Sequence, residues 1–523
     1  MKKLFNYRPI VLIFIAMCLS IVLSVYYLSG RSSVLCFITF LALILFVLIC
    51  SIIIRVLFRN VFEIATFAKR LIYFCSAIFV GVLCVVMNFI YINSHEIDYS
   101  YYVVTARISS LIKESSSGEY KYMQLDDLSL ENLDGATIKL NDNMKVFVPD
   151  YEIDDNYKVG VYVMFPALVR NINMSSVSEV NSNYSNICDG VFYVGELKAE
   201  PTILDEYKVT IFDEIKSKAL SILNHNLEKD SAGLAYAMIF GDTAEIEHNT
   251  KVNYTSTGTA HLLAVSGLHV GFVVVIFTFL LKLLKADDKQ ILFIITSALL
   301  LYLIFCNFAT SIIRATIMTF CLLLARVLKK HYDSLSGLAL AGVIILFISP
   351  LQFFDVGFRL SFMAVLGIIL LNGPISRLLS YAIGEKFGKT IAVALSANIG
   401  TMMIMITNFN MYSPLGIITN IFVVPFASLC YMFLFVALLV SLIFPAISAI
   451  VAPFGFGMNI INNIIWFGTG SAVLFDNVKY SKLINVLYGI GLISVSDYYL
   501  RNYKYKAIAC GIVVSSMVLL AIL

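Results

Sequence analysis

Runs of about 20 consecutive apolar residues are the feature that most limits what this chain can fold into, because that length of α-helix spans about 30 Å of hydrocarbon. Only 14% of the residues are charged, against about 25% in soluble globular proteins. We therefore predict a polytopic α-helical membrane protein with about a dozen transmembrane helices. The candidate spans are residues 9–28, 33–54, 70–92, 261–281, 289–307, 310–328, 335–349, 356–372, 388–408, 412–444, 482–496 and 505–523. The run 412–444 is long enough for two passes, with a break expected near Pro425.

Basic residues in the short loops predict how the chain is oriented, since Lys and Arg concentrate on the cytoplasmic side. Arg55, Arg59, Lys69 and Arg70 lie between the second and third spans and place that loop inside. Basic residues of the second membrane region fall in alternate loops, which gives the same topology; they are Lys282, Lys285, Arg326, Lys329, Lys330, Arg377, Lys386 and Lys389. We predict a multi-pass protein of the cell (inner or cytoplasmic) membrane, with a cytoplasmic N-terminus and residues 93–204 extracytoplasmic.

The polar insert after the third span has the pattern of a small β domain. Short segments rich in Val, Ile, Tyr and Phe alternate with Gly, Asn, Asp and Ser clusters; examples are Tyr101–Ile108, Lys145–Val148, Gly160–Phe165 and Val191–Leu197. About five such strands suit a small closed barrel. Residues 93–200 hold 17 acidic and 8 basic residues, whereas a surface that binds DNA tightly is usually basic. Our hypothesis is that this domain guides or gates a nucleic-acid strand without binding it tightly, or binds a protein partner. The alternative is that its acidic surface is simply solvated.

Four parts follow from these patterns. They are an N-terminal three-helix membrane region (1–92), the extracytoplasmic β domain (93–204), an amphipathic helix (205–230) and a second membrane region (231–523). The apolar face of 205–230 suits either an interfacial helix or an ordinary packing helix.

The most informative stretch runs from Thr257 to Gly271, where polar residues open an otherwise apolar segment. His261, Ser266 and His269 would each be costly in hydrocarbon unless they meet water or a partner. Three glycines, Gly258, Gly267 and Gly271, allow another backbone or a ligand to approach closely. We therefore expect this segment to line a polar path and to pack tightly.

Further polar residues extend this path. The predicted topology puts His261, Arg314, Asp355 and Arg359 within one or two turns of the outer face, with Ser266 and His269 deeper and Asn398 near the midplane. Such a lining suits a hydrated polyanion such as single-stranded DNA. The candidate path residues are Asp242, His261, Ser266, His269, Arg314, Asp355, Arg359, Asn398 and Asn420.

Structural roles for the same residues stay open. Asp355 and Arg359 are spaced i, i+4 and would suit an ion pair, and Arg314 would reach an interface from a helix end. The histidines and asparagines would serve equally to join helices, and Asp242 to cap a helix turn. His261 and His269 would lie about 80° apart on a continuous helix, a poor arrangement for a shared metal. We predict no catalytic residue, metal or cofactor.

Several motifs resemble those of the ComEC family, the competence channel for DNA internalisation. They are Gly241-Asp242 with His261-Leu-Leu-Ala-Val-Ser-Gly-Leu-His-Val-Gly; Ser311-Ile-Ile-Arg314-Ala315; Asp355-Val-Gly-Phe-Arg359-Leu-Ser361; Ala397-Asn398 with Gly400-Thr401; Ser413-Pro; and Asn420 through Pro425. The resemblance implies an OB-like fold for the outer insert and a channel that translocates single-stranded DNA into the cytoplasm during natural transformation. It also implies three partners: an extracellular DNA receptor, a separate nuclease and a cytoplasmic helicase-like ATPase.

The chain also departs from the family pattern. A Gly-Asp-Arg motif reads Gly241-Asp242-Thr243, and Met402 and Met403 stand near an expected proline. The sequence contains no His-x-His-x-Asp-His metal cluster, so we expect a form without the C-terminal metallo-β-lactamase-like domain, and no enzyme. The alternatives are a membrane-embedded metal-dependent hydrolase using His261, His269 and Asp355, or a transporter of another anionic polymer or solute.

Overall fold

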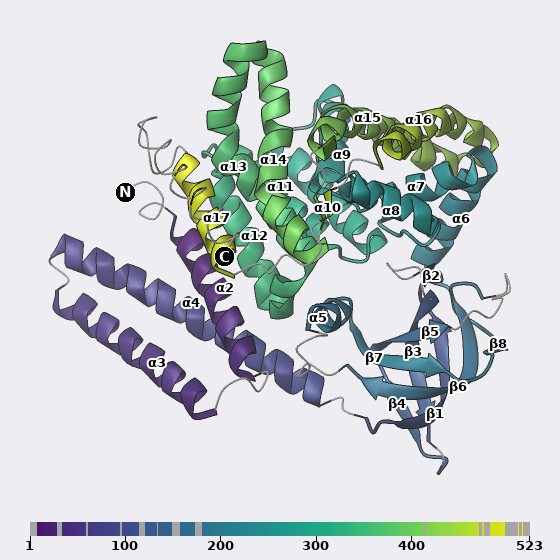
Figure 1. The fold of residues 1–523 in the computed structure, drawn as a ribbon, viewed down its shortest axis with the longest axis horizontal. Helices are drawn as coiled ribbons and strands as arrows, with labels where there is room; N and C mark the ends of the chain where they lie inside the picture. The colour runs from purple at the N-terminus through teal and green to yellow at the C-terminus, as the bar shows by residue number, and fades with distance from the viewer. Residues whose placement is uncertain are drawn as a thin grey trace.

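A computed structural model of the chain shows three N-terminal helices, a β domain and a large helical region (Figure 1). It describes residues 8–28, 34–58, 61–94, 97–114, 121–132, 134–148, 157–172, 180–409, 411–412, 415–469, 473–474 and 482–496, with the single positions 511 and 515. The predicted span 505–523 therefore lies almost entirely outside the described residues.

The described part of the N-terminal region consists of α2 (Pro9–Tyr26), α3 (Val34–Leu57) and α4 (Phe62–Asn93). Helix α4 packs against both α2 and α3. Just before α2, the Arg8 guanidinium donates two hydrogen bonds of 2.8 and 2.7 Å to the Asp333 carboxylate. This pair ties the start of α2 to the start of α12 (Ser334–Ile348), so the N-terminal region is joined to the second membrane region.

The β domain has eight strands and one helix. They are β1 (Ser100–Ile108), β2 (Lys113–Glu114), β3 (Lys121–Glu131), β4 (Thr137–Leu140), β5 (Asn143–Val148), β6 (Val161–Asn171), α5 (Val180–Cys188), β7 (Val191–Leu197) and β8 (Thr202–Tyr207). Strand pairing runs β1–β3–β5–β7–β6 and returns to β1, with β5 and β7 parallel. Alternate residues such as Val104, Leu125 and Val163 point inward and are fully buried. The circuit agrees with the predicted small closed barrel.

The helical region holds the remaining elements. They are α6 (Ile211–Asn226), α7 (Lys229–Phe240), α8 (His248–Ser256), the 3₁₀ turn η2 (Ala260–Leu262), α9 (Gly267–Leu283), α10 (Asp288–Phe305), α11 (Thr310–Val327), α12, η3 (Pro350–Phe354), α13 (Val356–Ile383), α14 (Glu385–Phe409), β9 (Met411–Tyr412), α15 (Leu415–Ile443), η4 (Pro445–Val451), α16 (Ala452–Gly468), β10 (Val473–Leu474) and α17 (Lys482–Val495). Within the described residues, eight helical segments are long and apolar enough to cross a membrane, accompanied by four shorter apolar helices. The predicted fold class, a polytopic helical membrane protein with a β insert, is confirmed.

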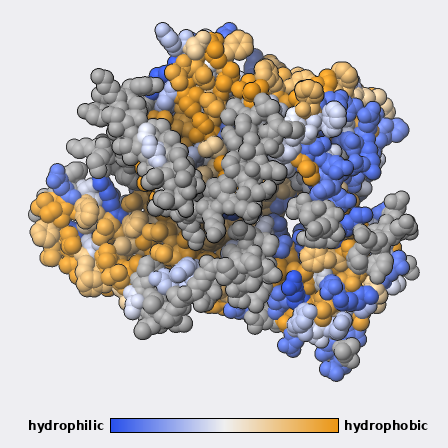
Figure 2. Space-filling model, viewed as in Figure 1, coloured by the Kyte–Doolittle hydropathy of each residue, from blue (hydrophilic) through white to orange (hydrophobic). Residues whose placement is uncertain are grey.

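The outer surface of the helices suits lipid. Phe46, Phe293 and Phe422 are 64%, 74% and 70% exposed, which would be unfavourable over so wide an area in water. Figure 2 shows apolar residues spread over α3, α4 and the α13–α14 hairpin, while hydrophilic residues gather on the side of α6, α8 and the β domain. The chain is therefore a multi-pass membrane protein.

Several predicted details were wrong. Helix α15 continues through Pro425 without a break, because a membrane helix tolerates proline where neighbouring groups satisfy the freed carbonyl. Helix α16 was not predicted, since glycines and asparagines dilute its apolar run. Residues 205–207 belong to strand β8, and α6 begins only at Ile211, behind a Thr210–Asp213 capping box. Its inward face, Ala219 and Leu223, packs into a core shared with α7, α15 and α16.

Candidate functional site

A line of polar side chains follows one face of α14. Asn398, Thr401 and Asn408 fall within an arc of about 80° around the helix and span about 15 Å along it. Gly400 lies to one side of this arc, about 80° from Asn408, and packs against α13, where a Cβ on Gly400 would lie 2.5 Å from the Met363 carbonyl oxygen. Helix α14 therefore packs closely on α13 through Gly400, while its polar line contacts α13 at Asn408, which accepts a 3.1 Å hydrogen bond from Arg359.

The polar face of α14 meets α15 and the segment before η2. Asn420 Nδ2 lies 3.5 Å from both Asn398 Oδ1 and the Gly258 carbonyl oxygen. The His261 ring also bonds to the Gly258 backbone. The residue surface of His261 is exposed.

His269 lies in the first turn of α9, within electrostatic range of His261. Its Nδ1 accepts a 3.3 Å hydrogen bond from the Ser266 backbone N–H, so that nitrogen carries no proton. Its ring stacks on Tyr431 at a centroid distance of 4.1 Å. The Tyr431 hydroxyl lies 3.1 Å from that of Tyr302, which donates to the Ile239 carbonyl at 2.8 Å. The buried imidazole thus begins a polar chain that joins four helices.

The sequence-based placement of the two histidines was wrong in one respect. The helix was expected to begin at His261, but α9 begins at Gly267 and His261 lies on η2. The predicted angle of about 80° between the two rings assumed 3.6 residues per turn throughout and does not apply. Their depths along a continuous helix do not apply either.

Arg314 lies in the first turns of α11 and is only 6% exposed. One terminal nitrogen of its guanidinium would lie 2.6 Å from a Cβ placed on Gly267, so the cation rests against the start of α9. Three residues earlier, the Ser311 hydroxyl donates a 2.7 Å hydrogen bond to the Val265 carbonyl. Helix α11 is therefore fastened to the segment that leads into α9.

Asp355 and Arg359 do not form the ion pair that their spacing allows. Asp355 caps α13 by accepting from the Phe358 N–H at 2.8 Å. The Arg359 guanidinium instead donates to the Phe354 carbonyl at 3.0 Å and to Asn408 Oδ1 at 3.1 Å. Arg359 thus stands at the end of the α14 polar line.

Asp242 lies where the β domain meets the helical region. It follows Gly241, whose positive φ of 78° ends α7, and its Oδ1 accepts from the Ala244 N–H at 3.1 Å. The same oxygen lies 3.2 Å from the Lys113 ammonium of β2. Asp242 therefore both caps a turn, as one interpretation had it, and anchors the β domain.

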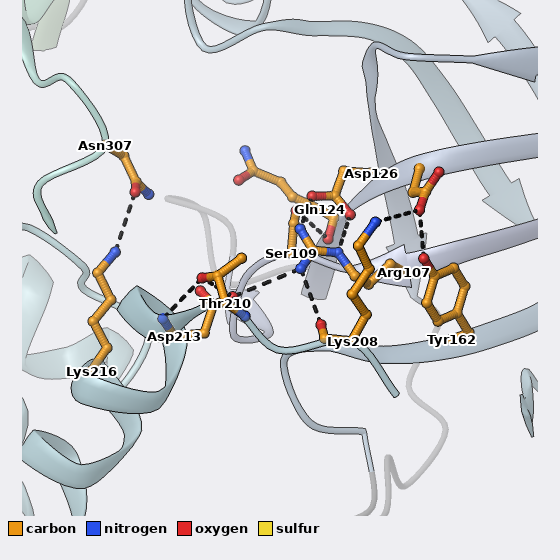
Figure 3. A network of polar contacts seen from close by, with 11 residues as sticks. Arg107, Ser109, Gln124, Asp126, Tyr162, Lys208, Thr210, Asp213, Lys216 and Asn307 are labelled. Atoms are coloured by element: carbon orange, nitrogen blue, oxygen red, sulfur yellow. Dashed lines mark hydrogen bonds and ion pairs between the residues drawn. The ribbon is translucent and has the colours of Figure 1, made fainter. Parts of the chain in front are cut away.

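Two more contacts fix the β domain on the helices. Figure 3 shows the first: Arg107 lies between Asp126 and Asp213, while Lys216 of α6 donates to Asn307 Oδ1 at 3.2 Å. The second is α5, which packs on η3.

At that second contact, the Ser185 hydroxyl lies 3.4 Å from Asp355 Oδ1. Burial, as the larger cause, and the nearby Asp355 carboxylate, as the smaller one, raise the pKa of Asp189 to about 6. Asp189 of the insert therefore lies close to the carboxylate that caps α13.

The three predicted packing glycines have different surroundings. Gly258 has a φ of 71°, a conformation that favours glycine, and Gly267 lies against Arg314. No described atom lies within 4 Å of a Cβ position on Gly271, so no described helix packs closely there. A close backbone contact between helices instead joins Gly367 of α13 to Gly400 of α14.

Sequence reasoning missed Asn408, Tyr431 and Lys113. Asn408 follows Asn398 by ten residues and so shares its helical face, a signal that was present in the sequence. Tyr431 sits in an apolar run, and Lys113 in a polar insert, where nothing marks either one. Among the described residues, no group of three or more His, Cys, Asp or Glu side chains is placed to hold a metal ion.

Comparisons with known proteins bear on the helical region. Residues 238–497 match the family model described as "Competence protein". The chain is 28% identical over 225 residues to ComE operon protein 3 of Bacillus subtilis, covering 43% of this chain and 28% of that protein. It is 30% identical over 278 residues to an uncharacterized protein of Aquifex aeolicus, covering 51% and 62%.

A third relative is Recombination protein 2 of Haemophilus influenzae, 28% identical over 184 residues, which cover 34% of this chain and 23% of that protein. The matched segments thus span less than two thirds of each relative's own length. No solved structure matches the chain.

Proposed function

Because this membrane protein carries a competence-protein domain, as its motifs indicated, we propose that it forms the passage through which one strand of DNA enters the cytoplasm. The relatives' names refer to competence and recombination. We propose the predicted orientation as well, with the N-terminus inside and the β domain outside.

The observation that carries the proposal is the polar line from Asn408 through Asn398 and Asn420 to His261. Amide, hydroxyl and imidazole groups are costly among apolar helices unless they meet water, a partner or a ligand. Asn398, Thr401 and Asn408 each donate to a carbonyl of their own helix. The side-chain oxygens of Asn398 and Asn408 also face Asn420 and Arg359 of the neighbouring helices. Such groups can exchange hydrogen bonds with phosphate oxygens and base edges as a strand moves.

The two contacts of Asn420 are long, which suits transport. Distances of 3.5 Å between Asn420 and its two partners are at the limit of hydrogen bonding. A pathway conducts only when binding is favourable enough for entry but weak enough for release. Arg359, next to Asn408, supplies positive charge at one end of the line.

We further propose that the chain is not itself an enzyme. Pulling a strand inward against its hydration requires work, and the sequence shows no ATPase or nuclease motif. The proposal therefore requires a cytoplasmic helicase-like ATPase, a separate nuclease that degrades the other strand, and an extracellular DNA receptor. The β domain, whose charge is acidic, would guide the strand or bind one of these proteins.

The test compares two arginines in a deletion strain complemented with variants of the gene. Arg359→Ala is expected to lower uptake of labelled DNA at least tenfold, with the protein still present in the membrane. Arg326→Ala, at the exposed end of α11, is the matched control and should leave uptake unchanged. Equal uptake in both variants, or normal uptake in the deletion strain, would contradict the proposal.

A further inference from the structure

Arg314 is a buried cation that has no partner among the residues that the structure describes. The residue is 6% exposed, and its Nε has no hydrogen-bond partner. Neither an ion pair nor a hydrogen bond joins its guanidinium to any residue that the structure describes. A carboxylate near enough to influence it is also missing from the described residues. Proteins seldom keep a charge out of water unless something else compensates it.

The guanidinium faces the start of a helix. A Cβ on Gly267, the first residue of the 17-residue helix α9, would lie 2.6 Å from one terminal nitrogen of Arg314 and 3.6 Å from its Cζ. The first backbone N–H groups of a helix have no acceptor within it and carry partial positive charge. The Ser266–His269 capping box supplies an acceptor for the N–H of His269. The guanidinium and the remaining N–H groups of the first turn, those of Gly267 and Leu268, are therefore the donors that lie together at this corner.

Local contacts hold this corner in shape. Ser311, one turn before Arg314, bonds the Val265 carbonyl, and the Ser266 N–H bonds His269 Nδ1. The first bond fastens α11 to the segment before α9, and the second fixes the turn around Gly267 within that segment. The absence of a side chain at Gly267 leaves the guanidinium in direct contact with the backbone.

We propose that Arg314 and the first turn of α9 form an oxyanion site that takes one phosphodiester group of a nucleic-acid strand. The assignment to a strand rests on the proposed function. Helix N-termini and arginine each bind phosphate oxygens. Together they place positive charge at this corner, and a phosphate would be the negatively charged partner for it. A strand passing through the protein would be held here one phosphate at a time.

Thermal unfolding of the full chain in lipid nanodiscs tests the site with inorganic phosphate as the probe. Phosphate at concentrations on the order of millimolar should raise the melting temperature above that in chloride at equal ionic strength. Arg314→Gln should abolish this shift, and without phosphate it should melt no lower than the original protein. Arg326→Gln, on the same helix, is the control and should keep the shift. A shift that survives in Arg314→Gln, or is absent from the original protein, would overturn the site.

Two glycines on α9 give a second test. Gly267→Ala inserts a methyl group where the guanidinium lies and should weaken the phosphate response at least tenfold. Gly271→Ala, with no described atom within 4 Å, should leave the response intact. Equal phosphate responses in the two variants would argue against an oxyanion site between Arg314 and Gly267.

Single-stranded oligothymidylate then separates a strand from free phosphate. It should compete with phosphate at a far lower concentration, because neighbouring contacts add to the first. An oligonucleotide that fails to compete overturns the assignment to nucleic acid. If Arg359→Ala loses uptake but the original protein shows no phosphate response, this site alone is rejected. If the original protein responds to phosphate but its deletion leaves uptake normal, the proposed function alone is rejected.

Discussion

Asn420 on α15 places its amide nitrogen 3.5 Å from the side-chain oxygen of Asn398 on α14. Asn420 is only 5% exposed, and its own side-chain oxygen has no hydrogen-bond partner among the described residues. A buried acceptor left open in this way is costly. It marks the point where the polar line crosses from one helix to the next and where a moving ligand would find a free group.

Asn420→Leu should lower DNA uptake roughly two- to tenfold, the effect of about one hydrogen bond in the rate-limiting step. Folding should be preserved, because leucine has a similar size and relieves the unpaired acceptor. The measurement is uptake at matched protein level. Asn226→Leu, whose amide bonds only its own helix at Ile222, serves as the control; an equal decrease in both would contradict a role for the path.

His269→Phe should separate the transport role of His269 from its packing role. Phenylalanine keeps a ring against Tyr431 but removes the acceptor for the Ser266 N–H. We expect uptake to fall while the melting temperature changes little. His269→Ala should in addition destabilise the protein by about 3 kcal/mol, as truncation of a buried ring does. Normal uptake in His269→Phe would show that only stacking matters.

Gly400→Ala should destabilise the protein by about 1–3 kcal/mol, because the added methyl meets the Met363 carbonyl oxygen at 2.5 Å. Gly271→Ala should instead stabilise it by about 0.5–1 kcal/mol, since an open helix position gains from alanine. Thermal unfolding in detergent measures both. Changes of the same sign would contradict the packing described for α13 and α14.

The Arg8–Asp333 pair predicts a pH dependence. The hydrogen bonds from Arg8 lower the pKa of Asp333 to about 2, although burial of the carboxylate acts in the opposite direction. Because the pKa of this carboxyl is lower in the folded state than its unfolded value near 4, the ionised carboxylate stabilises the fold at pH values above about 4. That contribution is lost as the pH falls through about 2. Because the carboxylate is 37% exposed, we expect about 1 kcal/mol. Asp333→Asn should lower the melting temperature at pH 7 and remove this acid-dependent part; an unchanged profile would contradict it.

A charge exchange tests what Asp242 does. Asp242→Lys alone should set two cations against each other at the 3.2 Å contact with Lys113 and loosen the β domain. We expect this loosening to lower DNA uptake as well, and adding Lys113→Asp should restore the attraction and most of the uptake. Protease sensitivity where the β domain joins the helical region measures the loosening, and uptake of labelled DNA measures transport. Failure of the double variant to recover would indicate that Asp242 acts on the strand instead of on Lys113.

The helices that were predicted well are those with uninterrupted apolar runs. The span 310–328 corresponds to Thr310–Val327, and 9–28 to Pro9–Tyr26. Helix α16 escaped because Gly455, Gly457 and Asn459 interrupt its run. Strand Val191–Leu197 was predicted to the residue, since β-branched and aromatic residues there are bounded by turns.

The candidate site was foreseen in its residue types but not in its contacts. Polar groups in apolar helices are visible in a sequence because the bilayer penalises them. Their partners depend on how separate helices pack, so the Arg359 contact with the Phe354 carbonyl and the Asp242 contact with Lys113 were not predictable. The start of α9 at Gly267 depends on the turn around Gly258, which helical periodicity alone does not reveal.

The most direct test of a wet passage is the reactivity of cysteines placed along α14 in a background without native cysteines. Asn398→Cys, Thr401→Cys and Asn408→Cys should react with a charged, membrane-impermeant thiol reagent and be protected by single-stranded DNA. Val393→Cys, on an exposed apolar face of the same helix, should not react. If the three polar positions are as unreactive as Val393→Cys, no water reaches the line and the proposed passage does not exist.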